Sequence, residues 1–496
     1  MKLKVLSFFV FLLLATTVQA QFVMRRPVVN PQPADSADLV HYSKKRFWPA
    51  ASLVFGMNMG VWAFDRYALN ADFARISMHT IKDNFKNGFE WDNDQMGTNM
   101  FLHPYHGNLY YNSARSNGYN FWESGAFALS GSAMWELFME NEKPSINDII
   151  ATPVGGVAIG EVFYRTTDMI LDDTRRGRNR LWRETAAFII APTRGLSRII
   201  SGDAWKVRPT SGRQFGIPDV SVEVSAGVRI LELEDNIFDK GVGASTSINI
   251  EYGDKFDNEA TKPYDYFSFR ANLNVQASQP VLGQINIIGQ LWGVDAIDSQ
   301  KHYLGFGFYQ HFDYYDSDTI SNVSNKTPYK FGTPASFGIG MYHKNREFTK
   351  WSFDSYAHFN GILLGASLSD HYLVDKRNYN LGSGFGWKAG INIAYKNKIG
   401  LSWWYEGYRL FTWKGYPDGY DLSTALNNRL NSQGDKSNAT FNTSSIRLDL
   451  KIGRHLYLTG IASGYRRSTH YKYYNDVYSV TGEGKLMLTY KFGADN

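Results

Sequence analysis

The chain has 496 residues, a formal net charge of +5 and no cysteine. The charge is too small to indicate a nucleic-acid partner, and no basic tail is visible. The lack of cysteine excludes disulfides, thiolate metal ligands, a cysteine nucleophile and a lipidated cysteine, and the aromatic fraction of 16% is high for a soluble enzyme.

The first 20 residues have the pattern of a secretory signal peptide. Lys2 and Lys4 form a short positive region, "VLSFFVFLLLA" is apolar, and "VQA" places small residues before a cut expected after Ala20. An uncleaved anchor is the alternative, but the apolar run is short for a membrane span. No later segment offers about 18 uncharged apolar residues, so we expect no ordinary transmembrane helix in the mature protein. The proline-rich residues 21–45 are expected to be a linker.

Residues 46–210 are expected to form an α-helical domain. The segment "FWPAASLVFGMNMGVWAFDRY" is apolar, has helical spacing and ends in polar residues. Two later helices are expected to form a hairpin, because a capping box marks the start of each. Asn120 with Glu123 forms the first box, and Ser145 with Asp148 forms the second.

Both helices of this hairpin carry small residues four positions apart, which lets two helices approach closely. The uncharged core of each helix is about 12 residues long, too short to cross a bilayer alone. We therefore expect the helices to pack against each other and against the second half of the chain. The small residues are Ser124, Ala128 and Ser132 in the first helix and Gly156 and Gly160 in the second.

From Asp219 onward, apolar and polar residues alternate, which is the pattern of β-strands with one apolar face. "VSVEVSAGVRI", "VGASTSINIEY" and "FSFRANLNVQA" are the first three such segments. About twelve strands of this length predict a membrane β-barrel over residues 215–492, because lipid permits no open sheet edge. The nine further candidates are Val281–Val294, His302–Phe312, Ser336–Tyr342, Trp351–Leu364, Ser383–Tyr395, Ile399–Phe411, Ser444–Ile452, Leu456–Tyr465 and Tyr478–Phe492.

The connections between these strands are expected to alternate in length. Short turns near Lys344, at 396–398 and at 453–455 would face the periplasm, and longer polar loops would face outside. This alternation predicts an even number of strands. The expected long loops are Asp313–Tyr329, Ser367–Asn380, Lys414–Thr440 and Arg466–Val477.

The last strand, "GKLMLTYKF", resembles the terminal signal by which outer-membrane barrels are recognised for insertion. It departs from the usual form, because four residues follow the final aromatic residue. We expect the barrel-assembly machinery to recognise this strand and outer-membrane lipids to surround the inserted protein. The residues on its recognition face are Leu486, Leu488, Tyr490 and Phe492.

The stretches "HPYHGNLYYNSARSNGY" and "WESGAFALSGSAMWELFMENEKPSINDIIATPVGGVAIGE" resemble the domain-of-unknown-function family 3943. In that family, the helical domain typically precedes a barrel in outer-membrane proteins of Gram-negative bacteria. The resemblance covers roughly residues 99–165 and implies the same pairing here, but it implies no reaction. The residues at the polar positions of the family are His103, His106, Arg115, Glu136, Asp148 and Glu161.

Two interpretations of the polar residues in the helical half remain open. In the first, they form a structural cluster whose members satisfy one another, with Glu161 and Arg165 paired at i, i+4. In the second, they form the site of a lipid-modifying hydrolase, with His106 as base and His103 and Glu136 beside it. The members of the structural cluster are His103, His106, Arg115, Glu123, Glu136, Asp148, Glu161 and Arg165.

Neither a metal nor a catalytic motif supports the hydrolase. Two histidines on either side of Pro104 are a weak metal pattern, so we expect no metal and no cofactor. Outer-membrane phospholipase A is similar in strand count, but its motif of His, any residue and Ser-Asn-Gly is not met: the "SNG" at 116–118 lies in the helical half. We therefore commit to no catalytic residue.

The sequence leaves two functions. The first is a non-enzymatic outer-membrane barrel whose helical domain plugs the lumen or caps its periplasmic mouth, in transport or envelope organisation. The second is the lipid-modifying hydrolase. The arginine-rich segment "DDTRRGRNRLWRE", residues 172–184, is either a solvated turn or a contact with anionic lipid headgroups.

Overall fold

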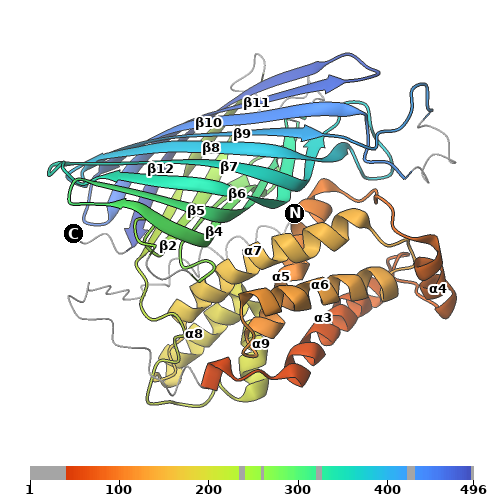
Figure 1. The fold of residues 1–496 in the computed structure, drawn as a ribbon, viewed down its shortest axis with the longest axis horizontal. Coiled ribbons are helices and arrows are strands. Elements are labelled where there is room, and N and C mark those ends of the chain that lie inside the picture. The colour runs from red at the N-terminus through yellow and green to blue at the C-terminus, as the bar shows by residue number, and fades with distance from the viewer. Residues whose placement is uncertain (1–40, 234–240, 259–261, 320–326, 422–430, 493–496) are drawn as a thin grey trace.

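A computed structural model describes residues 41–233, 241–258, 262–319, 327–421 and 431–492. The expected signal peptide, its cut after Ala20, most of the linker and the last four residues lie outside these ranges and stay predictions. Helices occupy the described chain up to residue 201, and strands follow from residue 220 (Figure 1).

The second half is a closed antiparallel barrel of twelve strands, in which chain neighbours pair and the first strand pairs with the last. The predicted fold class, a twelve-stranded barrel preceded by helices, is therefore confirmed. Closure pairs every strand on both sides and leaves no sheet edge. The strands are β1 Val220–Leu233, β2 Val242–Tyr252, β3 Phe267–Val275, β4 Leu282–Asp298, β5 His302–Asp316, β6 Lys330–Asn345, β7 Trp351–Leu368, β8 Tyr379–Tyr395, β9 Ile399–Phe411, β10 Ser437–Lys451, β11 Leu456–Tyr471 and β12 Val477–Phe492.

The two ends of the barrel differ in the length of their connections. At the end where β1 starts and β12 ends, here called the turn end, the short turns are 299–301, 346–350, 396–398 and 452–455. At the opposite end, here called the loop end, the longest connections are 317–329, 369–378 and 412–436.

Two connections differ from the predicted alternation. The prediction of a long loop at Arg466–Val477 is wrong, because β11 continues to Tyr471 and only residues 472–476 join it to β12. At the turn end, residues 253–266 form a long connection between β2 and β3. The polar residues near Arg466 suggested a loop. Some of them face the lumen and the others face solvent beyond the apolar wall, so strand β11 can extend past the end of this wall.

The helices before the barrel agree with the predicted hairpin. Asn120 forms the expected capping box with Glu123, whereas Ser145 caps the next helix only by accepting the Asp148 N–H. The helices are α3 Phe47–Tyr67, α4 Met78–Asn87, the π-helical turn η1 Thr98–Leu102, α5 His103–Arg115, α6 Phe121–Phe138, α7 Ile146–Ile170, α8 Gly177–Ile190 and α9 Pro192–Ser201.

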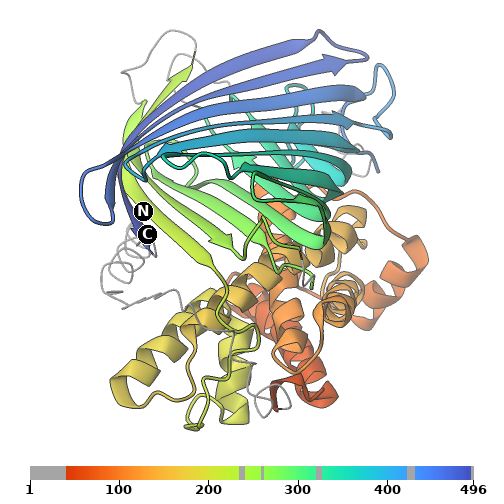
Figure 2. The same ribbon diagram turned by 60° about the vertical axis from the view of Figure 1, so that its left-hand side comes forward.

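The helical domain lies against the outside of the barrel (Figures 1 and 2). On β5, Phe306 and Phe308 are exposed on the outer face, and Phe312, which has the same parity, is buried in a core shared with α5 and α7. The Gln310 side chain, also on this outer face, donates a hydrogen bond of 2.8 Å to the Val154 carbonyl of α7. The domain therefore covers a part of the wall that would otherwise face lipid.

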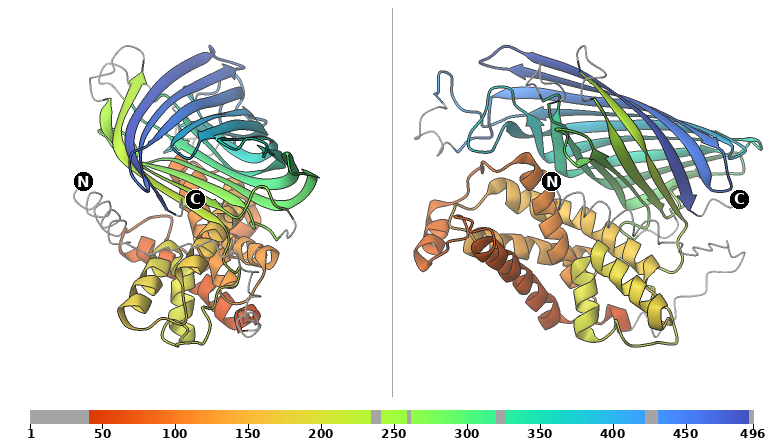
Figure 3. Two further views of the ribbon diagram at one scale, coloured as in Figure 1. Left: turned by 90° about the vertical axis from the view of Figure 1, so that its left-hand side faces the viewer. Right: turned by 180° about the vertical axis from the view of Figure 1, so that it is seen from behind.

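This position corrects one prediction. We expected the helices to plug the lumen or cap the periplasmic mouth, and instead they stand beside the barrel wall, as the end view of Figure 3 also shows. The prediction that they pack against the barrel is right. Alternation identifies the apolar outer face of each strand, but lipid and an apolar helix are equally good covers for that face.

The helix that contacts the wall most closely, α7, is also long and apolar enough to cross a membrane, the one such helix among the described residues. Of its most apolar stretch, 72% is buried. We expected no such helix because Asp148 and Glu161 interrupt the uncharged run. Both carboxylates are buried among protein groups, so neither faces lipid.

Candidate functional site

The eight polar residues of the predicted cluster do not form one group. They divide into an ion-pair network between α5 and α7, a histidine packed among aromatic rings, and an acidic group at the loop end. Glu123 lies apart from all three, at the surface, where it pairs with Lys45 at 2.6 Å and caps α6.

The ion-pair network is centred on Glu161, whose side chain is fully buried. Arg115 and Arg165 each place Nε 2.9 Å from a different oxygen of this carboxylate, and the Tyr111 hydroxyl donates to it at 2.7 Å. Arg165 also lies 3.1 Å from Asp265 in the β2–β3 connection. With its oxygens occupied by protein donors, Glu161 is placed to hold α5, α7 and the barrel together.

His106 lacks the partners that a catalytic base needs. Its ring packs against Tyr110 and Trp135 at centroid distances of 4.6 and 5.1 Å. Among the described residues, nothing bonds its Nε2, and its Nδ1 lies 3.5 Å from the Tyr110 hydroxyl. Within the described ranges, no carboxylate, serine or threonine forms a hydrogen bond with the ring, so the residues described do not supply a general-base arrangement.

Glu136, which the hydrolase interpretation places beside His106, instead makes a structural contact. Its Oε2 accepts the backbone N–H of Ser145 at 2.7 Å, at the start of α7. This bond satisfies a backbone donor that the start of a helix leaves without an intrahelical partner. Glu136 therefore joins the end of α6 to the beginning of α7 and does not contact His106 through a hydrogen bond.

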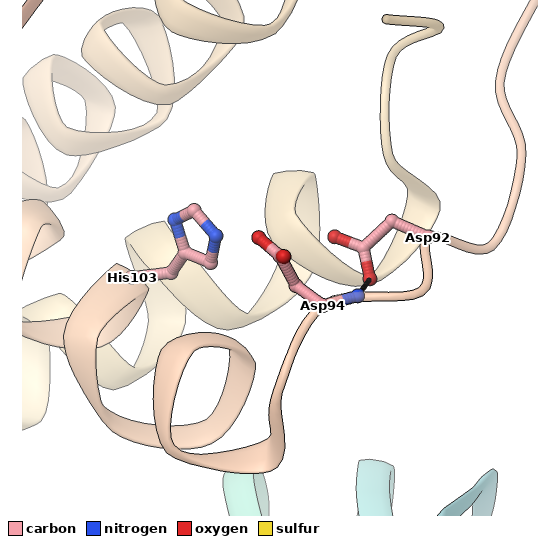
Figure 4. Close-up of side chains that lie close together, drawn as sticks. All are labelled: Asp92, Asp94 and His103. Carbon is pink, nitrogen blue, oxygen red and sulfur yellow. Dashed lines mark hydrogen bonds between the residues drawn. The ribbon is translucent and has the colours of Figure 1, made fainter. Parts of the chain in front are cut away.

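The acidic group at the loop end contains two residues that we did not single out. Asp92 and Asp94 face His103, the first residue of α5, and the potential ligand atoms of all three lie within 4.8 Å of one another (Figure 4). Asp148 places Oδ2 3.7 Å from His103 Nε2. The acid-rich stretch "EWDND", which ends at Asp94, was the available signal in the sequence.

Desolvation and charge act together on this group. Burial and the neighbouring Asp92 carboxylate raise the pKa of Asp94 above its usual value. Repulsion between nearby carboxylates favours a proton or a cation between them. The group is therefore a place where positive charge would be stabilised.

A second candidate site is the lumen of the barrel. Its turn-end half contains a cavity of about 360 Å³ whose walls are rich in paired charges. Arg447 and Lys491, for example, lie 2.7 and 2.8 Å from Glu223. Acidic and basic residues are equally numerous around the cavity: Glu223, Glu251, Asp354, Asp449 and Glu483 are acidic, and Lys255, Arg270, Arg447, Lys485 and Lys491 are basic.

Toward the loop end, aromatic rings pack together inside the barrel next to a layer of buried charges. Glu406 accepts hydrogen bonds from Tyr408 at 2.9 Å and Arg270 at 3.0 Å, and Lys388 pairs with Asp313 at 2.6 Å. We call these rings, together with the aliphatic side chains packed among them, the aromatic constriction. Its members are Tyr315, Tyr329, Phe331, Ile362, Tyr408, Leu410, Phe441 and Tyr465.

Above the aromatic constriction, the loops fold over the mouth of the barrel. Arg467 of β11 pairs with both oxygens of Asp370 in the β7–β8 loop, at 2.6 and 2.7 Å. In the β9–β10 loop, Asp435 accepts hydrogen bonds from Ser369 and Tyr416. These contacts hold two loops inward, and they join residues too distant in sequence for any local pattern to predict.

The comparisons with known proteins find different relatives for the helical half and for the barrel half of the chain. Residues 88–193 match the family model described as Domain of unknown function (DUF3943), a wider stretch than the 99–165 on which the sequence resemblance rested. A search of curated proteins finds no match to the chain. The structure thus defines a closed twelve-stranded β-barrel preceded by helices, and part of the helical region matches the DUF3943 model.

The barrel is similar to solved outer-membrane channels, each over 55% of this chain. The NanC porin is 8% identical, with a TM-score of 0.28 and 100% of its own chain covered. The toluene transporter TodX of Pseudomonas putida is 8% identical, with a TM-score of 0.22 and 90% covered. The outer membrane channel DcaP of Acinetobacter baumannii is 9% identical, with a TM-score of 0.22 and 96% covered. These likenesses say no more about this chain, whose fold is established by its own strand pairing.

Proposed function

We propose that the protein is an outer-membrane channel for small polar solutes, closed in the conformation described. The polar cavity in the lumen, which ends at the aromatic constriction, is the observation that carries this proposal. A closed barrel with an apolar outer wall and a polar interior suits a bilayer, and barrels of this kind are found in outer membranes. The terminal strand supports an outer-membrane location as well, because Leu486, Leu488 and Tyr490 project outward.

The charges of the cavity bear on the solute. A lumen lined by one sign of charge selects ions of the other sign. Here acidic and basic residues are equal in number and paired around the wall. Such a surface offers donors and acceptors of both kinds without a net field, which favours neutral or zwitterionic polar solutes over ions of one sign.

Phe441 should control passage through the aromatic constriction. Its ring is central there, with centroids 5.2 Å from Tyr315, 5.5 Å from Tyr329 and 5.0 Å from Phe331. Truncating Phe441 to alanine opens space within the aromatic constriction, so we expect Phe441→Ala to raise single-channel conductance in planar bilayers several-fold. Uptake of neutral sugars into proteoliposomes should rise with it.

The matched control is Phe306→Ala, the same change on the outer face of β5, which should leave conductance as in the wild type. Heat-modifiable migration on gels shows that each barrel is folded. A folded Phe441→Ala barrel with wild-type conductance and wild-type sugar uptake would contradict the proposal that the protein is a channel.

We infer further that the helical domain lies in the membrane beside the barrel. In α3, no charged residue occurs between Arg46 and Asp65, and Phe47, Phe55 and Phe64 are exposed. A water-facing helix normally carries polar groups on its open side.

The ends of the helical domain are polar, as a membrane-embedded bundle requires. At the turn end, Arg180 is buried and pairs with Asp173 and Glu184, at 2.9 and 2.8 Å. Arg175, which pairs with Asp172, and Arg176 and Arg178 are exposed. The arginine-rich segment is therefore partly an internal network, and we propose that Arg176 and Arg178 contact anionic headgroups, at about 1 kcal/mol each.

The position of α3 can be measured with single cysteines, because the chain has none of its own. Phe55 of α3, Phe359 on the outer face of β7 and Phe348 in a turn are each 54% exposed. Spin labels at Phe55→Cys and Phe359→Cys should collide readily with oxygen and rarely with a water-soluble nickel chelate, since both would face lipid. A label at Phe348→Cys should show the reverse. A Phe55 label that behaves like the Phe348 label would place α3 in water.

A further inference from the structure

The loop end of the helical domain contains a compact set of metal-ligating side chains (Figure 4). Asp92 and Asp94 come from the segment before η1, and His103 begins α5. Asp148, in the first turn of α7, lies against the same imidazole. Three separate elements thus direct four ligand-type side chains to one place.

Among the described residues, His103 is the cation-forming side chain in ion-pair contact with this set, and Lys376 acts on Asp94 from a greater distance. In the described part of the chain, no lysine or arginine forms an ion pair with Asp92, Asp94 or Asp148. Asp92, Asp94 and Asp148 all lie beside the His103 imidazole. Carboxylates gathered around one side chain repel one another, and a proton or a cation between them relieves this repulsion.

A buried amide supplies an independent observation. Asn99 of η1 is fully buried, and its Nδ2 lies 2.5 Å from Asp92 Oδ1, so the amide stands at the edge of the set. Its Oδ1 has no hydrogen-bond partner among the described residues. A buried acceptor without a donor costs about 1–3 kcal/mol, and an amide oxygen next to carboxylates is a common metal ligand.

We propose that Asp92, Asp94 and His103 bind a divalent transition-metal ion, with Asp148 and the Asn99 amide oxygen beside it. The donors are mainly oxygen with one imidazole. Calcium prefers oxygen ligands alone, whereas manganese and zinc accept carboxylate and imidazole together. The geometry therefore favours Mn²⁺ or Zn²⁺ over Ca²⁺.

Such an ion would lie where the helical domain meets the loops of the barrel. The Arg377 guanidinium in the β7–β8 loop donates to the Asp92 carbonyl, and the Tyr379 hydroxyl donates to the Asp94 carbonyl at 2.9 Å. The Asn93 amide donates to Asp375 of the same loop at 3.4 Å. Binding would fix the segment that carries these contacts, and this consequence does not depend on what the barrel transports.

The test uses the untagged full-length protein in detergent, stripped with a chelator and then titrated with Zn²⁺, Mn²⁺ or Ca²⁺. We expect roughly one Zn²⁺ or Mn²⁺ per chain by elemental analysis, weaker Ca²⁺ binding, and a rise in the unfolding temperature with metal. Asp94→Asn should weaken Zn²⁺ binding by at least about tenfold, in line with the loss of one charged ligand, and should abolish the thermal shift.

The control is Asp83→Asn, which changes an exposed aspartate paired with His79 on α4 and should leave both readouts unchanged. Asp94→Asn keeps the size of the side chain and removes repulsion, so the metal-free variant should fold at least as well as the metal-free wild type. The proposal is overturned if the wild type binds neither Zn²⁺ nor Mn²⁺, or if Asp94→Asn and Asp83→Asn bind both metals as the wild type does.

Discussion

Gly107→Ala should prevent the helical domain from assembling, while the barrel still closes. A Cβ at Gly107 would lie 1.8 Å from the Thr152 carbonyl oxygen and 3.2 Å from Gly156 Cα, both backbone atoms of α7. Backbone cannot rotate away as a side chain can, so the helices must separate. Overpacking a core typically costs about 1–3 kcal/mol, and we expect a cost at or above the upper end of this range.

The measurement is protease resistance of the helical domain alongside heat-modifiable migration of the barrel. Gly60→Ala in α3 is the matched control, because nothing lies within 4 Å of the Cβ it would add. It should be neutral or stabilising by up to about 1 kcal/mol, since alanine favours a helix over glycine. Equal protease resistance of the two alanine variants would show that α5 and α7 do not meet at Gly107.

Glu161→Gln should destabilise the domain almost as strongly, by about 3–5 kcal/mol, the usual cost of removing one partner from a buried ion pair. The substitution keeps the size of the side chain but leaves Arg115 without a counter-charge and Arg165 with only Asp265. Unfolding of the helical domain in urea, followed by protease resistance, measures the loss.

The control for this charge change is Glu123→Gln, made in another member of the predicted polar cluster. Glu123 pairs with Lys45 at the surface, where such a pair contributes about 0–1 kcal/mol, and glutamine can keep the capping box. Adding Arg115→Met to Glu161→Gln should recover part of the loss, because it removes the uncompensated cation. If the two single Gln variants unfold alike, Glu161 does not hold the helices together.

Local patterns predicted the apolar first helix, the two hairpin helices and the strands, whereas α4, α8 and α9 were not predicted as separate helices. The capping box at Asn120 depends on residues three positions apart, and the strand faces depend on alternation every two residues, so neighbours in sequence decide both. The pair Glu161–Arg165 was predicted for the same reason, since one turn of helix brings i and i+4 together. The strand count and barrel closure followed from strand length and apolar faces.

Contacts between distant segments decided the candidate sites. Alternation shows that Glu406, Lys388 and Asp313 face inward, but strand stagger and barrel closure decide that they meet. Asp92 and His103 meet because the π-helical turn η1 brings the chain around. His106, which the hydrolase interpretation took as a base, packs against the rings of Tyr110 and Trp135 in the structure.

The sequence by itself predicted a helical first half followed by a barrel with an apolar wall and a polar lumen, and the helices of the structure run from Phe47 to Ser201. Only the tertiary structure decided that the helical domain covers part of that wall on the outside. The physical reason is that burial of apolar surface has no direction: a strand face that is apolar is satisfied equally by lipid and by a helix. The choice between lipid and a helix depends on how well the surfaces fit together. Here the glycines of α7 let α5 pack closely, and the Phe312 ring of β5 packs against Gly155 of α7.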